Sequence, residues 1–457
     1  MLTSSPLSAV YLCAIIAMMI GHAWLCARRG RFLVLDPLNT FWGGALVCYV
    51  WQPIVHFDSL VSWRGVEIIE RTLLLIVLSV AGLILGYEAR LGRRIALRIP
   101  AMHAQLAPNP MRLSGLGVTA LGLLGYAYLV ASAGSWSAWL SHGRGGTDWG
   151  SVSGYWAQLI YLLPVGLSIL LFHVGFHAVA GLERILVWTS GFVYWLWIVY
   201  LGSRSMMIGF TLVLLSAYYL PRRRNPPLAL AAALAAGMLV LVQFQAAYRS
   251  RFTNLTILGN LDPEEVRASS SEWLVSGSSR TSEANTGLEF NCAAAVVEIV
   301  PERVDYNFGY AHLEKLTRPI PRALWPDKIY PALRAHTPIY REGGLSATPI
   351  ATSKEPLLAG PTLTFLGHWY AVGGFLAVAL AAFATGALFR ALRRVYDRQP
   401  GNEGDVMLYA MLFPIGFTEC AAEPLIFVFT LPFPILALLL VVRFSAARPQ
   451  VAPAGAS

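Results

Sequence analysis

Apolar stretches long enough to cross a bilayer recur along the whole chain, and they limit its fold more than any other feature. A helix needs about 20 mainly apolar residues to span the hydrocarbon core. Only 13% of the 457 residues are charged, whereas soluble domains carry about 25%. The sequence therefore predicts an all-α polytopic integral membrane protein, whose first apolar run is a span and not a cleavable signal peptide.

Eleven transmembrane helices are predicted from these runs. They cover residues 8–27, 36–55, 68–88, 113–133, 156–178, 183–201, 206–220, 227–247, 363–389, 405–420 and 424–442. The predicted organisation is helices 1–8 in residues 1–247, a large external loop with short helices at 248–360, helices 9–11 in 361–443, and a tail at 444–457. Gly82 and Gly86, and the stretch 115–122, are expected to pack against neighbouring helices.

Arginine is concentrated in alternate loops. The clusters at 28–31, 90–98, 222–224 and 390–398 all fall on one side of the predicted topology. Cytoplasmic loops are enriched in arginine and lysine, so we expect a periplasmic N-terminus and a cytoplasmic C-terminus. The net charge of +9 therefore reflects topology, and nucleic acid is not an expected partner.

The external loop at 248–360 is long enough to suggest a function. Residues 288–304 carry apolar side chains at helical spacing, which predicts a helix on the membrane surface. The later stretch "LTRPIPRALWPDK" (316–328) holds three prolines that forbid a regular helix. It also holds Arg318, Arg322 and Lys328, and a stiff backbone lowers the cost of positioning such cations around an anion. A solvated turn is the alternative interpretation.

Further arginines lie near the predicted external face. Arg204, in "LGSRSMM", is costly at a membrane edge unless it is paired or faces a wet cavity. Arg249 and Arg251 follow a span at its external end, where arginine is unexpected. Because arginine grips phosphate with two hydrogen bonds, these residues are candidate anion contacts. The alternatives are a snorkelling side chain for Arg204 and membrane-edge anchors for the other two.

Candidates for acid–base chemistry are fewer. His368 begins a predicted span, where a titratable imidazole is unusual, although a lone histidine is more often structural. Glu289 opens the predicted surface helix, where the helix dipole also favours a carboxylate as a cap. The five cysteines show no CxxC pair and no close Cys/His cluster, and we expect them to be apolar packing residues. Metal-binding, P-loop and GxSxG motifs are absent, so no cofactor or metal is expected.

Three segments resemble elements of the Wzy-type O-antigen and oligosaccharide repeat-unit polymerases. They are "GSRS" (202–205), "NFGYAHLEKLTRPIPRALWPDK" (307–328) and "GPTLTFLGHWYAVGG" (360–374). The resemblance covers roughly Gly202 to Gly374. It departs from the family pattern after Lys328, where isoleucine stands in place of proline.

The resemblance implies a GT-C-like glycosyltransferase of the bacterial inner membrane. Its substrates would be undecaprenyl-diphosphate-linked oligosaccharides, joined at the periplasmic face without a metal, with a chain-length regulator protein as a partner. Arginines aimed at the departing diphosphate would stabilise the transition state. The expected diphosphate contacts are Arg204, Arg249, Arg251, Arg280, Arg318, Arg322 and Lys328, and the expected bases are Glu289 and His368.

Three other interpretations remain open from the sequence. An O-antigen ligase would share the architecture and the donor but use lipid A-core as acceptor. A transporter or flippase for lipid-linked sugars would predict internal symmetry and cations deep inside spans, which the sequence does not show. An intramembrane cysteine protease would need a histidine near Cys292 or Cys420 in the sequence, and neither cysteine has one.

Overall fold

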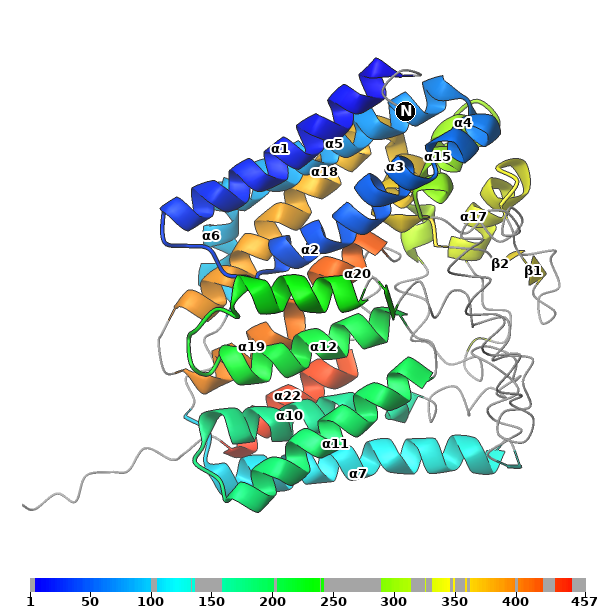
Figure 1. Ribbon diagram of the computed structural model, residues 1–457. Helices are drawn as coiled ribbons and strands as arrows, with labels where there is room; N and C mark the ends of the chain where they lie inside the picture. Colours follow the sequence, from blue (N-terminus) through cyan, green and yellow to red (C-terminus); the bar gives the residue numbers. More distant parts are fainter. Residues whose placement is uncertain are drawn as a thin grey trace, which may run out of the picture. The chain divides into compact units, whose positions relative to one another are not determined.

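The computed structural model of the protein is helical in nearly all of the part that it describes (Figure 1). Its β-structure there is one antiparallel pair of two-residue strands, β1 (Thr348–Pro349) and β2 (Leu358–Ala359), with Thr348 opposite Ala359. The described residues are 5–99, 105–132, 134–135, 158–200, 204–238, 240–241, 289–313, 325, 331–345, 348–349, 358–359, 362–398, 402–421 and 432–445.

Six helices in these ranges are long and apolar enough to cross a membrane. They are α1 (Pro6–Arg28), α5 (Val66–Glu88), α7 (Pro108–Ser132), the stretch Leu159–Phe176, α11 (Gly181–Tyr200) and α18 (Thr364–Asp397). Several present large apolar side chains outward, such as Leu85, which is 65% exposed. Such surfaces suit a lipid environment, and the fold is that of a helical membrane protein.

The chain divides into two compact units. Unit 1 comprises Met1–Arg98, Leu228–Arg394 and Phe413–Phe429. Besides α1, α5, most of α18, β1 and β2, its described elements include α2 (Pro37–Ala45), η1 (Leu46–Trp51), α3 (Gln52–Val55), α4 (Phe57–Arg64), α6 (Arg90–Arg98), the shorter apolar helix Leu228–Met238, α15 (Glu289–Ile299), η4 (Tyr310–His312), α17 (Pro331–Glu342) and α20 (Ile415–Ala421). Helix α1 packs along α5, which in turn packs on α18 (Figure 1).

Glycines let α5 and α18 approach each other closely. A methyl group added at Gly82 would lie 3.0 Å from a backbone carbonyl oxygen of α18, and one at Gly86 would overlap the backbone of Phe383. Gly386 of α18 faces the backbone of Leu83 in the same way. Small residues at helix contacts permit this in membrane proteins, and the packing surface predicted at Gly82 and Gly86 is confirmed.

A buried carboxylate joins the start of α2 to α5 and α18. Asp36 accepts hydrogen bonds from the Leu38 backbone N–H at 2.9 Å and the Tyr87 hydroxyl at 2.8 Å. Arg393 lies 3.7 Å from the same carboxylate, and the Arg390 guanidinium lies 5.1 Å from the centre of the Tyr87 ring. The predicted topology placed these two arginines in a loop. In the structure both lie in α18, and their guanidinium groups contact residues inside unit 1.

Helix α15 is buried on all sides, which corrects the prediction of a helix on the membrane surface. Every residue from Phe290 to Val297 is buried, and the helix packs against α4, α5, α17 and η1. Apart from Asn291 and Glu298, the helix interior is apolar all round, and such helices lie inside a protein. The apolar face seen in the sequence was one part of this uniformly apolar surface.

Two glycines interrupt α18 after its third turn. Gly373 and Gly374 have non-helical backbone angles, and the Ala371 carbonyl oxygen accepts a hydrogen bond from the Asn307 backbone N–H at 2.9 Å. Gly374 has a φ of +67°, and a Cβ there would lie 2.8 Å from the Tyr306 hydroxyl oxygen. The interruption therefore leaves the Ala371 carbonyl oxygen available to Asn307 and leaves room beside Gly374 for the Tyr306 side chain. Both residues belong to the segment that follows α15.

Unit 2 comprises Ile99–Pro227, Val395–Leu412 and Thr430–Ser457. Its described elements include α7, η2 (Gln158–Tyr161), α10 (Leu162–Phe176), α11, α12 (Arg204–Tyr219), α19 (Glu403–Leu412) and α22 (Pro432–Ser445). Helix α10 packs on α7, α11 and α12. A Cβ at Gly122 of α7 would overlap the Leu163 backbone of α10, which confirms the packing surface predicted at 115–122.

Two predicted spans have irregularities that the hydropathy pattern does not show. The span at 36–55 is helical throughout but contains the π-helical segment η1. The span at 405–420 is broken, since α19 ends at Leu412 and α20 begins at Ile415. Pro414 lies in the break, and proline removes a backbone donor and clashes with the preceding turn of a helix.

We predict that Gly374→Ala destabilises the protein by about 1–3 kcal/mol, because a side chain at this positive φ is strained and its Cβ would clash with Tyr306. The measurement is the apparent midpoint of thermal unfolding in detergent. Gly373→Ala is the matched control, since Gly373 has no positive φ and its Cβ would lie 3.4 Å from the nearest atom, an ordinary contact. Equal midpoints for the two variants would contradict the prediction.

Candidate functional site

A buried glutamine holds Glu289 at the start of α15. Gln52, the first residue of α3, is 8% exposed. Its amide group donates to Oε2 of Glu289, and its carbonyl oxygen accepts from the Phe290 backbone N–H at 3.0 Å. Among the described residues, Oε1 of Glu289 has no hydrogen-bond partner, and the side chain is partly exposed. Glu289 is therefore oriented through one oxygen.

Arg64 attaches α15 to its neighbours with three hydrogen bonds. Its Nε donates to Asn291 Oδ1 at 2.9 Å, Nη1 to Glu298 Oε2 at 2.8 Å, and Nη2 to the Gly343 carbonyl oxygen at 2.8 Å. The arginine ends α4, and Gly343 follows α17. The arginine side chain is 11% exposed, so these bonds form in a largely dry environment and fix three elements together.

Three histidines from three elements meet next to α15. Nδ1 of His312 in η4 lies 3.4 Å from Nε2 of His368 in α18, and these two ring centroids are 4.6 Å apart. The ring of His336 in α17 lies 5.4 Å from that of His368, edge to face. His336 and His368 are buried, while His312 is partly exposed. The ring of Trp369 lies 4.7 Å from that of His312.

The histidine pair can hold and pass one proton. A hydrogen bond between two imidazoles requires one ring nitrogen to carry the proton and the other to accept it. His312 is partly exposed as a residue, but its Nε2 atom is buried, so a proton shared by this pair is held inside the protein. We call His312, His336 and His368 the histidine cluster.

Glu289 and the histidine cluster flank one helix contact. A Cβ at Gly367 of α18 would lie 3.2 Å from the Val296 side chain and 3.4 Å from the Ala293 backbone, both in α15. Glu289 is one turn before Ala293, and His368 directly follows Gly367. The fold therefore brings both predicted bases to α15 and its contact with α18.

The structure locates the remaining predicted site residues only in part. Arg204 is the first residue of α12, and its side chain lies outside the described part of the chain. The other predicted diphosphate contacts also lie outside the described residues, namely Arg249, Arg251, Arg280, Arg318, Arg322 and Lys328. Their roles stay predictions from the sequence.

The sequence reasoning missed Gln52, Arg64 and His312. Gln52 interrupts a predicted span, and a polar side chain in such a run is a signal for a buried contact. Arg64 lies in a predicted external loop, where arginine is uncommon. His312 lies within the segment that resembles the polymerases, yet a single histidine there carries little information without its neighbours.

Three of the five cysteines follow the packing prediction. Cys48, Cys292 and Cys420 are buried, and burial raises the pKa of the Cys292 thiol to about 12, so this residue lacks the thiolate that a nucleophile needs. Cys26, however, lies 3.7 Å from Nε2 of His22. The expectation that no cysteine belongs to a close Cys/His cluster is therefore wrong, and the spacing of four residues on α1 is the signal that was overlooked.

Comparison with known proteins yields no match. No family model matches the chain, and no curated protein or solved structure shows significant similarity to it.

We predict that Arg64→Ala lowers the free energy of unfolding by about 3 kcal/mol, because it leaves the part-buried Glu298 carboxylate and the Gly343 carbonyl without their donor. The measurement is the thermal or denaturant-induced unfolding of the purified protein in detergent.

Arg71→Ala is the control for this prediction. Arg71 pairs with Glu67 on α5 at 2.9 Å, with both side chains exposed, and such pairs contribute less than about 1 kcal/mol. A loss for Arg64→Ala no larger than that of the control would show that the three bonds do not hold α15.

Proposed function

We propose that the protein is a polymerase of undecaprenyl-diphosphate-linked oligosaccharide repeat units at the periplasmic face of a bacterial inner membrane. The observation that carries this proposal is the contact between two of the segments that resemble such enzymes. The segment 307–328 supplies His312 and the segment 360–374 supplies His368, and their ring nitrogens lie 3.4 Å apart. A second contact between these segments joins Asn307 to Ala371.

The proposed reaction moves the growing chain from its lipid carrier to a new repeat unit. A hydroxyl oxygen of the acceptor sugar attacks C1 of the donor sugar, and the bond from C1 to the diphosphate oxygen breaks. The electron pair leaves with undecaprenyl diphosphate, and the hydroxyl proton passes to a base on the protein. A base must lie within hydrogen-bond reach of that proton.

Glu289 and the histidine cluster are the groups proposed to receive this proton. Glu289 is held by Gln52 through Oε2 and is partly exposed, so Oε1 suits contact with a hydroxyl. His312 is partly exposed as a residue, although its Nε2 atom is buried, and His368 is buried beside it. We therefore assign proton acceptance to Glu289 first, with the His312–His368 pair as the second candidate.

The predicted topology belongs to the proposal as well. Eleven spans with an external loop at 248–360 would place Glu289, His312 and His336 on the periplasmic side, and His368 at the start of the ninth span. Helix α15 and η4 both fall within that loop. Arginines at the outer membrane edge, Arg204 and Arg322 foremost, would neutralise the departing diphosphate without a metal.

Deletion of the gene followed by sizing of the surface polysaccharide tests the proposal. We expect the loss of long chains while a single repeat unit stays attached, because ligation would continue without polymerisation. Loss of all attached repeats would identify an O-antigen ligase instead. Unchanged polysaccharide would overturn both.

We predict that Glu289→Gln lowers the rate of chain extension by about 10²–10⁴-fold, the usual contribution of a positioned base. The measurement is the initial rate of polymer formation by purified protein supplied with lipid-linked repeat units. Glu302→Gln is the matched control, since this exposed glutamate lies just beyond α15. Equal rates for the two variants would exclude Glu289 as the base.

We predict that Arg204→Ala and Arg322→Ala each abolish long polymer while protein abundance in the membrane stays normal. The reason is the loss of charge stabilisation for the departing diphosphate. Polymer sizing and immunoblotting of membrane fractions provide the two readouts. Chains of wild-type length in both variants would defeat the assignment of these arginines.

A further inference from the structure

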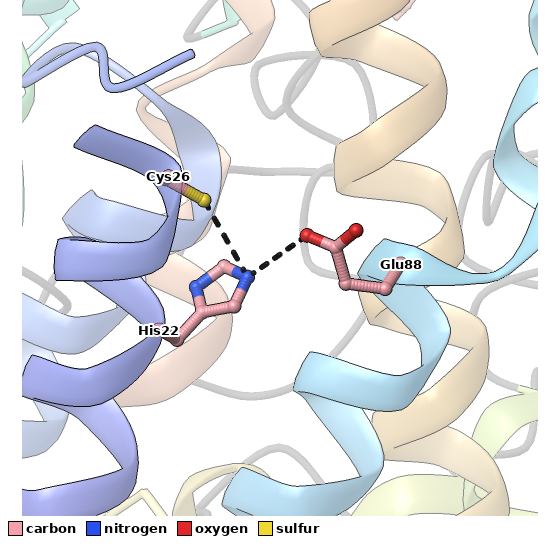
Figure 2. A group of neighbouring side chains, drawn as sticks. All are labelled: His22, Cys26 and Glu88. Carbon is pink, nitrogen blue, oxygen red and sulfur yellow. Dashed lines mark hydrogen bonds and ion pairs between the residues drawn. The ribbon is translucent and has the colours of Figure 1, made fainter. Parts of the chain in front are cut away.

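Three potential metal ligands converge between α1 and α5, at the helix ends beside the basic loops. His22 and Cys26 are four residues apart on one face of α1, and Glu88 is the last residue of α5 (Figure 2). One ligand atom from each lies within 4.8 Å of the other two. Among the described residues, no other group of three or more His, Cys, Asp and Glu side chains has its ligand atoms this close together.

Two of the distances between these atoms are close to the edges of a metal tetrahedron. Nε2 of His22 lies 3.3 Å from Oε1 of Glu88 and 3.7 Å from Sγ of Cys26. Bonds of about 2.0–2.1 Å to nitrogen and oxygen and about 2.3 Å to sulfur, at tetrahedral angles, place such ligand atoms about 3.4–3.6 Å apart. These two separations therefore agree with ligands of one zinc-sized ion, and the atoms of Cys26 and Glu88 lie within 4.8 Å of each other.

Hydrogen bonding alone satisfies this arrangement poorly. If Nε2 of His22 carries a proton, that proton can point well at Glu88 or at Cys26 but not at both. If Nε2 is unprotonated, its lone pair faces the carboxylate oxygen with no hydrogen between them. The 3.3 Å distance between Nε2 of His22 and Oε1 of Glu88 also exceeds the usual 2.9–3.0 Å of a good N–H···O bond. A cation bound by all three lone pairs removes this conflict.

We infer that His22, Cys26 and Glu88 form a binding site for a borderline divalent transition-metal ion, with Zn²⁺ as the best fit. The mixed nitrogen, sulfur and oxygen donors favour zinc over Mg²⁺ or Ca²⁺, which prefer oxygen alone. Three protein ligands leave a fourth position for water. The site would join α1 to α5, and it is independent of the proposed polymerase activity.

The surroundings suit a bound cation. Nη1 of Arg29 lies 3.6 Å from Oε2 of Glu88, the oxygen opposite the proposed ligand atom, and so orients the carboxylate from outside. The His22 side chain is 5% exposed, while that of Glu88 is 32% exposed. The imidazole is thus sheltered, and an ion can enter from the carboxylate side.

Metal binding to the purified full-length protein tests the inference. After chelation and removal of loosely bound metal, we expect one Zn²⁺ per chain by titration in a competing chelator buffer. We also expect a higher unfolding midpoint with Zn²⁺, because a ligand that binds the folded state stabilises it. With Co²⁺ as probe, a thiolate-to-cobalt charge-transfer absorption should appear. Mg²⁺ should give none of these effects.

Variants separate this site from adventitious binding. His22→Gln, Cys26→Ser and Glu88→Gln should each weaken Zn²⁺ binding at least about tenfold, and Cys26→Ser should remove the cobalt absorption. Cys13→Ser is the matched control, because Cys13 lies on the same helix but is exposed and distant from the cluster. Absence of Zn²⁺ binding, or binding that all three variants retain, would overturn the inference.

Discussion

Polar groups inside an apolar helical body must find partners, and unit 1 is organised around the pairs that result. An unpaired buried donor, acceptor or charge costs more than its hydrogen bond would contribute. Arg64 donates hydrogen bonds to Asn291 and Glu298 of α15 and to the Gly343 carbonyl oxygen just after α17. Without such partners α15 would carry two polar side chains into a dry interior. With them, an almost entirely apolar helix from the predicted loop can be buried.

The same requirement links the backbone to the candidate site. Breaking α18 at Gly373 and Gly374 leaves a carbonyl free of its helical partner, and Asn307 supplies the missing donor. That bond fixes the segment that carries η4, and therefore His312, beside the first turns of α18. At the N-terminal end of α15, the Gln52 amide donates to the Glu289 carboxylate and accepts from the Phe290 backbone N–H. Two glycines and one glutamine thus help to position the groups proposed for proton transfer.

The two polar clusters of unit 1 differ in what they are suited to do. The histidine cluster and Glu289 combine a partly exposed group with a buried support, which is suited to proton transfer to or from a bound molecule. His22, Cys26 and Glu88 instead bring a nitrogen, a sulfur and an oxygen atom within 4.8 Å of one another, which is suited to a cation. One chain can carry both, since they use different helices and different chemistry.

The sequence by itself determined that this is a helical membrane protein, because the length of an apolar run reports directly on the bilayer it must cross. It also determined the glycine contacts on α5 and α7, since small residues in a span have few other uses, and it singled out Glu289 and His368. Only the tertiary structure decided that α15 is buried, that His312 and His336 join His368, and that Gln52 and Arg64 support the site. Those facts depend on contacts between residues far apart in the chain, such as Arg64 and Glu298, and no local pattern of hydropathy or spacing records which distant partner satisfies a buried polar group.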